Sequence, residues 1–361
     1  MKVTTVGLDL AKNVFQVHGA DERGHKVFNR QLKHAQMMEF FVKLPPCVVA
    51  MEACGSAHHW ARKLSSLGHT VKLIAPQHVK PFVKTNKNDA ADAQAICEAM
   101  NRPQMKFVAA KSPEQQGVGA LHALRAGAMK ARNATSSRLR GLLLEFGIRI
   151  PEGISCISKH VPDALEDASN EIPTVLRIAL FDEYEQFKAL EVRVARLQQQ
   201  IDQWHRTSAA SQALAKIPGV GLLTATSMVA QAGDPSAFAN GRQVSAWLGI
   251  VPKQNSSGGK TTLLGISKHG DSYLRTLLIH GARSIVSLLK RRLASGADPA
   301  KFSPTERWLV ELLKRRNANV ACVALANKNA RTAWAILKHG RPYEPGHVSL
   351  SPRARAALAA A

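Results

Sequence analysis

The sequence predicts an α/β domain at the N-terminus and a mainly helical remainder. Three observations lead to this fold class. Short β-branched and apolar runs alternate with amphipathic helical patterns in roughly the first hundred residues. Beyond them, apolar residues recur three and four apart, which is the spacing of one helix face. The length of 361 residues is enough for two or three domains, each with its own core.

The N-terminal elements follow the order β-β-β-α-β-α-β-α. Strands are expected at short apolar runs, which are Val3–Leu10, Val14–His18, Lys26–Arg30, Cys47–Met51 and Thr70–Ala75. Helical patterns cover Gln36–Leu44 and Ser56–Leu67, and Asn88 is a suitable N-cap for a further helix. This is the order of the ribonuclease-H-like fold, in which the first strand lies centrally and the fourth lies beside it.

Four acidic residues would meet in such a fold. Asp9 lies near the end of the first strand and Glu52 ends the fourth, while Asp89 and Asp92 share one face of a helix. Carboxylates that lie so close together stay ionised only when a cation neutralises them. A ligand set made of oxygen atoms alone selects Mg²⁺ or Mn²⁺. Two such ions would stabilise both oxygens exchanged in a phosphoryl transfer.

Each part of this acidic pattern also has a simpler interpretation. An Asp pair three residues apart is commonly a solvated helix face. Asp9 alone would also suit the phosphate loop of an actin-like or sugar-kinase fold. Those folds need a second Gly-rich phosphate loop after a later strand, and the sequence has none.

The charge balance predicts a polyanionic partner. Lys and Arg number 49 against 26 Asp and Glu, which gives a net charge of +23 and a pI near 10.2. Nucleic acid is the commonest such partner. No apolar run approaches the ~20 residues of a membrane span, there is no signal-peptide layout, and the five cysteines show no metal-ligand spacing. We therefore expect a soluble, reduced, cytoplasmic protein without a membrane partner.

A basic segment and a heptad segment follow. No Asp or Glu occurs between Gln115 and Leu144, and this helix or helix pair predicts a phosphate-tracking surface rather than a merely solvated face. Its basic residues are Arg125, Lys130, Arg132, Arg138 and Arg140, and Lys84 and Lys87 precede the acidic helix in the same way. Ile154–Asn170 is expected to be loop-like because of Pro162.

The heptad stripe predicts a coiled coil. Apolar residues alternate spacings of three and four, at Phe187, Leu190, Val194, Leu197, Ile201 and Trp204. Such a stripe can join copies of the chain, as a dimer or tetramer. An intrachain helical hairpin would show the same pattern.

The C-terminal half contains two glycine-bearing motifs. Ile217–Gly221 (IPGVG) is typical of a helix-hairpin-helix turn, in which Gly219 and Gly221 let backbone N–H groups approach a phosphate. An ordinary helix–helix turn needs the same residues, and the sequence leaves the two interpretations even. A polar loop follows, and further expected phosphate contacts lie at Lys260, Lys268 and Arg275.

Six segments, in this order, carry a family resemblance: GLDLAKNVFQV, AMEACGS, KTNKNDAADAQAI, PGVG, SSGGK and GISKHGDSYLR. Together they resemble the DEDD-type insertion-sequence transposases, a family that includes the Piv DNA invertase and the bridge-RNA-guided recombinases. The resemblance implies that Asp9, Glu52, Asp89 and Asp92 form the metal quartet of a RuvC-like domain. The family's nucleophilic serine directly precedes a glycine, which implies Ser257 and leaves neighbouring Ser256 open.

The resemblance also implies a function. We expect a transposase or site-specific DNA recombinase of a mobile element, with metal-dependent strand exchange through a phosphoserine intermediate. Its partners would be DNA (element ends and target), a structured guide RNA and further copies of the chain. Ser257 would then work together with the carboxylate quartet, within one subunit or across two. The alternatives are a metal-dependent RuvC-like junction nuclease that uses water, and a non-enzymatic nucleic-acid-binding protein.

The expected domain plan has four parts. Residues 1–150 form the RuvC-like domain with its basic helices, and 151–210 form a helical coiled-coil segment. Residues 211–340 form the C-terminal transposase domain, and 341–361 form a disordered tail.

Overall fold

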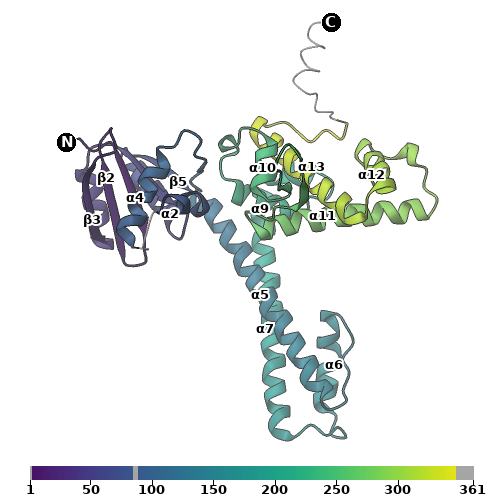
Figure 1. Ribbon diagram of the computed structural model, residues 1–361. Coiled ribbons are helices and arrows are strands. Elements are labelled where there is room, and N and C mark those ends of the chain that lie inside the picture. The colour runs from purple at the N-terminus through teal and green to yellow at the C-terminus, as the bar shows by residue number, and fades with distance from the viewer. Residues whose placement is uncertain (1, 84–87, 347–361) are drawn as a thin grey trace. The chain divides into compact units, whose positions relative to one another are not determined.

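The computed structural model describes residues 2–83 and 88–346. The chain forms two compact units (Figure 1). Unit 1 comprises Met1–Gln116 and Ala230–Ala239, and unit 2 comprises Gly117–Val229 and Asn240–Ala361. Residues 117–150 thus group with the second unit, whereas the sequence suggested that they belong to the N-terminal domain. The tail expected at 341–361 lies outside the described residues from 347 onward.

Unit 1 contains a six-stranded sheet of order β3-β2-β1-β4-β5-β6. Its strands are β1 Thr5–Leu10, β2 Val14–Ala20, β3 Lys26–Lys33, β4 Val48–Glu52, β5 Thr70–Ile74 and β6 Phe107–Val108. β1 pairs antiparallel with β2 and parallel with β4. The prediction of a central first strand beside the fourth is therefore confirmed, and the α/β architecture is consistent with a ribonuclease-H-like domain. The two-residue β6 was not predicted.

Helices cover both faces of this sheet. They are α1 Met37–Lys43, α2 Ala57–Ser66, α3 Pro76–Val79 and α4 Asp89–Met100, with 3₁₀ turns at His34–Gln36 and Lys80–Phe82. One core cluster joins β1 and β2 to α1 and α2 through large side chains such as Phe15, Phe41 and Trp60. The opposite cluster joins β4 and β5 to α3 and α4 and includes the fully buried Ile74 and Ile96. Each face thus has its own apolar layer.

Unit 2 contains three helices that form an arm. These are α5 Pro113–Leu144 (whose first four residues belong to unit 1), α6 Ile154–Glu166 and α7 Thr174–Thr207. The prediction of a loop at Ile154–Asn170 is wrong over α6. Its residues Ile157, Val161 and Leu165 recur four apart and are buried in one cluster with α5 and α7, and this burial outweighs the hydrogen bond that Pro162 removes.

The predicted heptad stripe lies on α7 and is partly buried within the chain. Phe187 and Ile201 are fully buried, and Leu197 is 7% exposed. The intrachain alternative therefore accounts for much of the stripe, and a coiled coil between subunits stays a prediction.

The remainder of unit 2 is helical apart from one hairpin. Its helices are α8 Ala209–Ala215, α9 Leu222–Ala232 (whose last three residues belong to unit 1), α10 Gly241–Trp247, α11 Ser272–Ala294, α12 Pro304–Arg315 and α13 Ala318–His339. Two 3₁₀ turns lie at Pro235–Ala237 and Pro299–Lys301, and the hairpin strands are β7 Pro252–Gln254 and β8 Leu263–Ile266. α13 packs against α11 and α10. Across the described parts of the chain, no helix has both the length and the apolar character required to cross a membrane.

Candidate metal centre and serine hairpin

Three of the four predicted carboxylates come together in unit 1. One ligand oxygen each from Asp9, Asp89 and Asp92 lies within 4.8 Å of the others. Asp9 lies near the end of β1, and α4 begins at Asp89. Asn88 caps this helix, since its side-chain oxygen accepts from the Ala91 N–H at 2.8 Å. The N-cap predicted from the sequence is confirmed.

Gly7 explains why α4 lies so close to β1. A Cβ at Gly7 would stand 2.1 Å from the carbonyl oxygen of Ala93, so only glycine permits this approach. Ala93 follows Asp92 directly. The absent side chain on β1 therefore places the first turn of α4, with its two aspartates, next to Asp9.

Glu52 lies on the neighbouring strand. It ends β4, and the β1–β4 register pairs Leu8 with Met51, so Glu52 follows the same strand edge as Asp9. Burial, and then the carboxylates of Glu52 and Asp9, raise the pKa of the Cys54 thiol, which places both carboxylates near that sulfur. Glu52 is not part of the 4.8 Å group among the described residues.

The donor chemistry of this centre fits a hard divalent cation. Its ligand atoms are all carboxylate oxygens, Asp9 and Asp92 are half-buried, and Asp89 is exposed. Such a set suits Mg²⁺ or Mn²⁺ rather than zinc, which prefers nitrogen and sulfur. The predicted phosphate contacts Lys84 and Lys87 lie outside the described residues.

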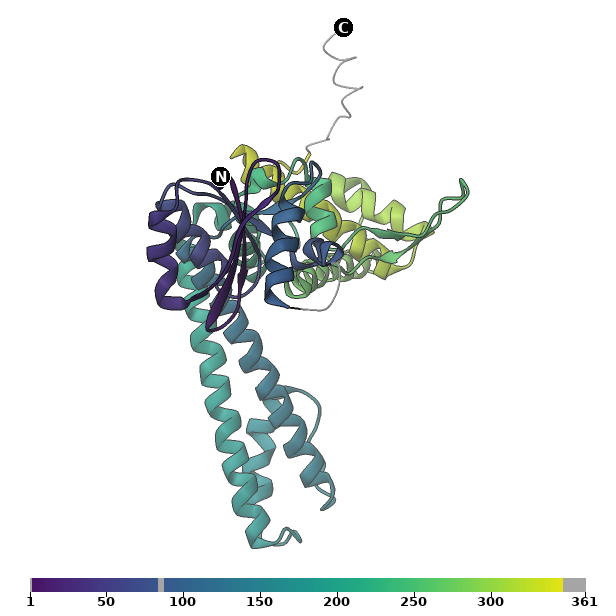
Figure 2. The same ribbon diagram turned by 60° about the vertical axis from the view of Figure 1, so that its left-hand side comes forward.

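The polar loop with the candidate serine is the turn of a β-hairpin. β7 and β8 pair antiparallel, and Ser257 and Lys260 face each other across the turn. Gly258 and Gly259 have φ angles of +55° and +78°, as the two central residues of a type I′ turn require. Figure 2 shows this hairpin extending away from the helices of unit 2. The sequence predicted the loop but not its short strands.

The two serines of this turn differ in their contacts. The Ser256 hydroxyl accepts from the Thr262 N–H at 3.1 Å and from Gln254 Nε2 at 2.9 Å. Among the described residues, the exposed Ser257 hydroxyl has no hydrogen-bond partner. Ser256 therefore stabilises the hairpin, and the described contacts leave the Ser257 hydroxyl accessible.

Two of the predicted basic contacts on α5 have structural partners. Arg138 donates to Glu183 of α7, and Arg140 donates to the carbonyl of Pro151 at 3.1 Å. Arg125 contributes to a buried cluster, and its Nε has no partner in the described structure. Lys130 and Arg132 fit the predicted phosphate-contacting surface best, because Lys130 is exposed and, among the described residues, Arg132 hydrogen-bonds to its neighbour Asn133.

The two glycines of the candidate helix-hairpin-helix turn, Gly219 and Gly221, differ in whether packing requires them. Gly219 has φ +84°, and a Cβ there would come within 3.0 Å of the Gly281 carbonyl oxygen on α11, so packing alone requires glycine. A Cβ on exposed Gly221 would meet no atom within 4 Å.

The last two predicted basic contacts precede or begin α11. Arg275 donates to the carbonyls of Leu248 at 3.1 Å and His269 at 2.9 Å, so it holds the segment before α11. Lys268 is exposed and has a positive φ of +57°.

A buried histidine that sequence reasoning missed joins α5, α9 and α11. His122 Nε2 lies 2.9 Å from Thr226 Oγ1, and Nδ1 lies 3.0 Å from the Tyr273 hydroxyl. Both ring nitrogens of His122 are therefore hydrogen-bonded, and the Thr226 hydroxyl also lies 2.9 Å from the Leu222 carbonyl oxygen. Burial, and then the charge of Arg125, lower the pKa of His122 to about 4. The sequence signal that could have revealed this residue is a histidine that lies within a stripe of leucines.

Comparisons with known proteins match both units. A family model described as "Transposase", of the DEDD IS110 type, matches residues 6–148, and one described as "Transposase IS116/IS110/IS902 family" matches 211–295. A Pseudomonas aeruginosa protein named "Probable family 20 transposase" is 50% identical over 347 residues, covering 96% of this chain and all of its own length. The transposase for insertion sequence element IS1111A of Coxiella burnetii is 41% identical over 95% of this chain and 92% of its own. That for IS1328 of Yersinia enterocolitica is 38% identical, over 94% and 98% respectively.

Proposed function

Since the chain belongs to the IS110/IS116 family of DEDD transposases, enzymes that recombine the DNA of mobile elements, we propose that it exchanges strands through a phosphoserine at Ser257. The observation that carries this proposal is the contrast within the hairpin turn. Ser257 offers an exposed hydroxyl with no partner in the described structure, whereas Ser256 is already hydrogen-bonded.

The proposed reaction conserves phosphate esters. Ser257 Oγ attacks the scissile phosphorus as the bond from phosphorus to one deoxyribose oxygen breaks, and the departing oxygen takes up a proton as serine loses its own. A hydroxyl of another strand then attacks the phosphoserine, which restores serine and forms a new phosphodiester. No ATP is needed, because each step exchanges one ester for another. Attack by water would instead leave a free phosphate end.

Asp9, Glu52, Asp89 and Asp92 would hold the Mg²⁺ or Mn²⁺ of this reaction. When bound, such an ion neutralises charge on phosphate oxygens and favours the deprotonated form of a nearby hydroxyl. The chain's own contribution is to fix the ligands, since β1, β4 and the first turn of α4 are regular elements joined by backbone pairing and close packing. At the hairpin turn, Lys260 would pair with the phosphate that Ser257 attacks.

We extend the proposal to partners. The net charge of +23 supports binding of both DNA and a structured guide RNA. Exposed apolar side chains on α7, such as Ile178, Phe181 and Val192, support a homo-oligomer, as a dimer or tetramer. Sequencing the RNA that copurifies with the protein would test the guide directly, and random cellular RNA would contradict it.

Covalent trapping on labelled DNA tests the nucleophile. Ser257→Ala should bind DNA and divalent metal normally while losing both strand exchange and the covalent adduct. Ser256→Ala is the matched control and should retain the adduct, with reduced yield because the hairpin loses two hydrogen bonds. Denaturing gels and peptide mapping locate the adduct. An adduct at another residue refutes Ser257, and cleavage without any adduct supports the junction nuclease instead.

A further inference from the structure

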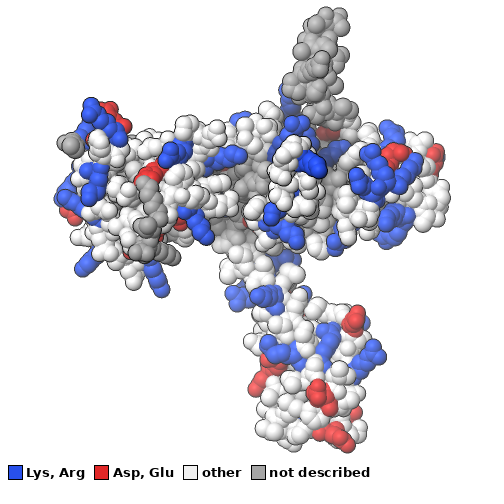
Figure 3. Space-filling model, viewed as in Figure 1, with Lys and Arg blue, Asp and Glu red and all other residues white. Residues whose placement is uncertain are grey.

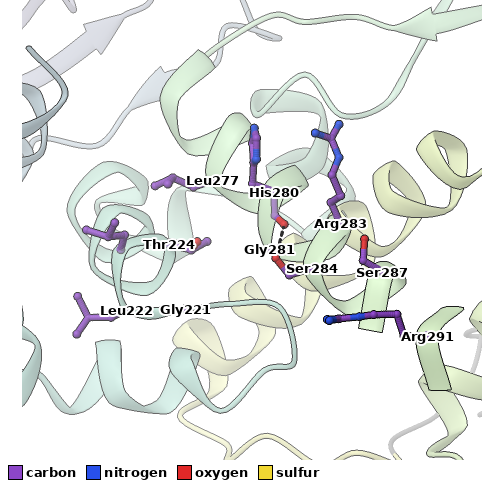
Figure 4. Close-up of a pocket in the computed structure, with 11 residues that line it drawn as sticks. Gly221, Leu222, Thr224, Leu277, His280, Gly281, Arg283, Ser284, Ser287 and Arg291 are labelled. Atoms are coloured by element: carbon purple, nitrogen blue, oxygen red, sulfur yellow. Dashed lines mark hydrogen bonds between the residues drawn. The ribbon is translucent and has the colours of Figure 1, made fainter. Parts of the chain in front are cut away.

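A groove between α9 and α11 in unit 2 has a volume of about 640 Å³. One side is the first turn of α9, with Gly221, Leu222 and Thr224. The other side is a face of α11 (Figure 4). We call this the α9–α11 groove.

Two glycines bring the walls of this groove together. A Cβ on Gly281 of α11 would stand 1.9 Å from the carbonyl oxygen of Gly219, so the hairpin before α9 packs directly on the α11 backbone. Asn329 of α13 fixes the same hairpin, because its side-chain amide donates to the Pro218 carbonyl at 2.8 Å. The groove is therefore preformed.

The α11 wall is basic and hydroxyl-bearing. Ser284, Ser287 and Arg291 follow at spacings of three and four and lie on one helix face, with Arg283 beside them. No lining residue is Asp or Glu, and in the described structure neither arginine forms a salt bridge with a carboxylate. Lys and Arg side chains also gather over α12 and the end of α11 (Figure 3), where Lys290, Arg315 and Arg316 are exposed.

The α9 wall adds backbone donors. Gly221 directly precedes α9, so no side chain at this position can accept from the N–H groups of the first helical turn. Packing does not require glycine here, because a Cβ at Gly221 would meet no atom within 4 Å. The missing side chain would let the backbone of a ligand come close to the start of the helix.

We propose that the α9–α11 groove binds the sugar-phosphate backbone of duplex DNA. Guanidinium groups, hydroxyls and helix N-terminal amides are the groups that contact phosphates. From Arg283 to Arg291 the helix rises about 12 Å, the length of three to four base-pair steps at about 3.4 Å each. The groove lining includes His280 but no Phe, Tyr or Trp, so it offers little of the base stacking that single strands need. The inference rests on the transposase acting on DNA and is independent of Ser257.

Binding measurements on the full-length protein test this groove. The double variant Arg283→Gln, Arg291→Gln should weaken binding to a labelled DNA duplex on the order of tenfold near 0.1 M salt, equally for different sequences. The slope of log affinity against log salt should become shallower by about two, one per lost phosphate contact. Fluorescence anisotropy without divalent metal measures this apart from catalysis.

Two further variants separate the groove from other effects. Arg23→Gln, Arg30→Gln removes two exposed charges from unit 1 and should change affinity far less. Gly221→Ala should weaken DNA binding with at most a small decrease in melting temperature, because alanine is a poorer residue than glycine directly before a helix. It also avoids any loss of stability caused by removing Arg283, which lies near the Cys322 thiol.

The outcomes are distinguishable. Wild-type affinity and salt slope in both the arginine variant and Gly221→Ala overturn the inference, as does an equal loss in the unit 1 control. A loss confined to an RNA duplex of the same sequence, or to single strands, also overturns it. Loss of duplex DNA binding with the Ser257 adduct still formed at saturating DNA supports it.

Discussion

At Ser256 and Ser257, two adjacent hydroxyls have opposite surroundings. The sequence could not separate them, because the difference arises from a type I′ turn that directs Ser256 into the hairpin ladder. Asp9, Asp89 and Asp92 were predictable, since a strand end and an i, i+3 helix spacing determine where carboxylates point. The distance of Glu52 from the other three carboxylates depends on how the elements pack, and the spacing of residues in the sequence does not determine that packing.

A single substitution in the metal centre tests whether its residues bind the catalytic metal. Asp89→Asn should abolish strand exchange, because a neutral amide is a weak ligand for Mg²⁺. The fold should persist, and without metal the melting temperature should match or exceed that of the wild type, since repulsion among the carboxylates falls. Exchange assays and thermal unfolding in a chelator measure both effects. Glu98→Gln, on the same helix, is the control that should keep activity. Robust exchange by Asp89→Asn in Mg²⁺ would exclude the residue from the centre.

Among the elements, those with long periodic patterns were predicted well and those set by tertiary contacts were not. The strands of the central sheet follow from β-branched runs. β6, β7 and β8 have two to four residues, too few to show any period. α6 was missed because Pro162 suggested a break, while its buried face is visible only once α5 and α7 are placed.

The His122 cluster predicts a pH dependence that involves three helices. The pKa of this histidine is lowered from 6.5 to about 4, so the unfolded chain binds the proton more tightly than the folded one. Arg125 opposes protonation and Asp271 favours it. Stability is therefore expected to fall as the pH drops from about 6.5 to about 4.

A non-titrating variant isolates this effect. In His122→Gln, the change in melting temperature between pH 7 and pH 5 should be smaller than in the wild type. His78→Gln, at an exposed site on α3, is the control and should leave the wild-type pH dependence intact. An identical pH dependence in His122→Gln would show that the cluster does not contribute.

The α7 stripe predicts a difference between two substitutions on one helix. Leu197 is 7% exposed and Val192 is 67% exposed. Leu197→Asp places a charge in an apolar contact, which should cost several kcal/mol and lower the melting temperature by about 10 °C. Val192→Asp should leave stability unchanged. Light scattering of both variants then reports assembly. A folded but smaller species from Leu197→Asp would mean that the stripe joins subunits.

At the scale of the whole molecule, composition alone predicted the partner class but not the unit boundaries. The excess of Lys and Arg follows directly from the composition. In contrast, residues 230–239 belong to unit 1 because of tertiary contacts, which the sequence does not show. One is the hydrogen bond from Lys111 Nζ to Gln231 Oε1 at 2.5 Å, between residues far apart in sequence.

The net charge of +23 predicts opposite effects of salt on stability and on binding. Salt screens self-repulsion, so the melting temperature of the free protein should rise between ~50 and ~500 mM KCl. Over the same range DNA affinity should fall steeply, because the counterions released on binding gain less entropy when the surrounding salt is more concentrated. Thermal unfolding and anisotropy on one preparation measure both. Sucrose is the control, since it stabilises without screening and should leave DNA affinity nearly unchanged. A melting temperature that falls with KCl would mean that local ion pairs outweigh global repulsion in this fold.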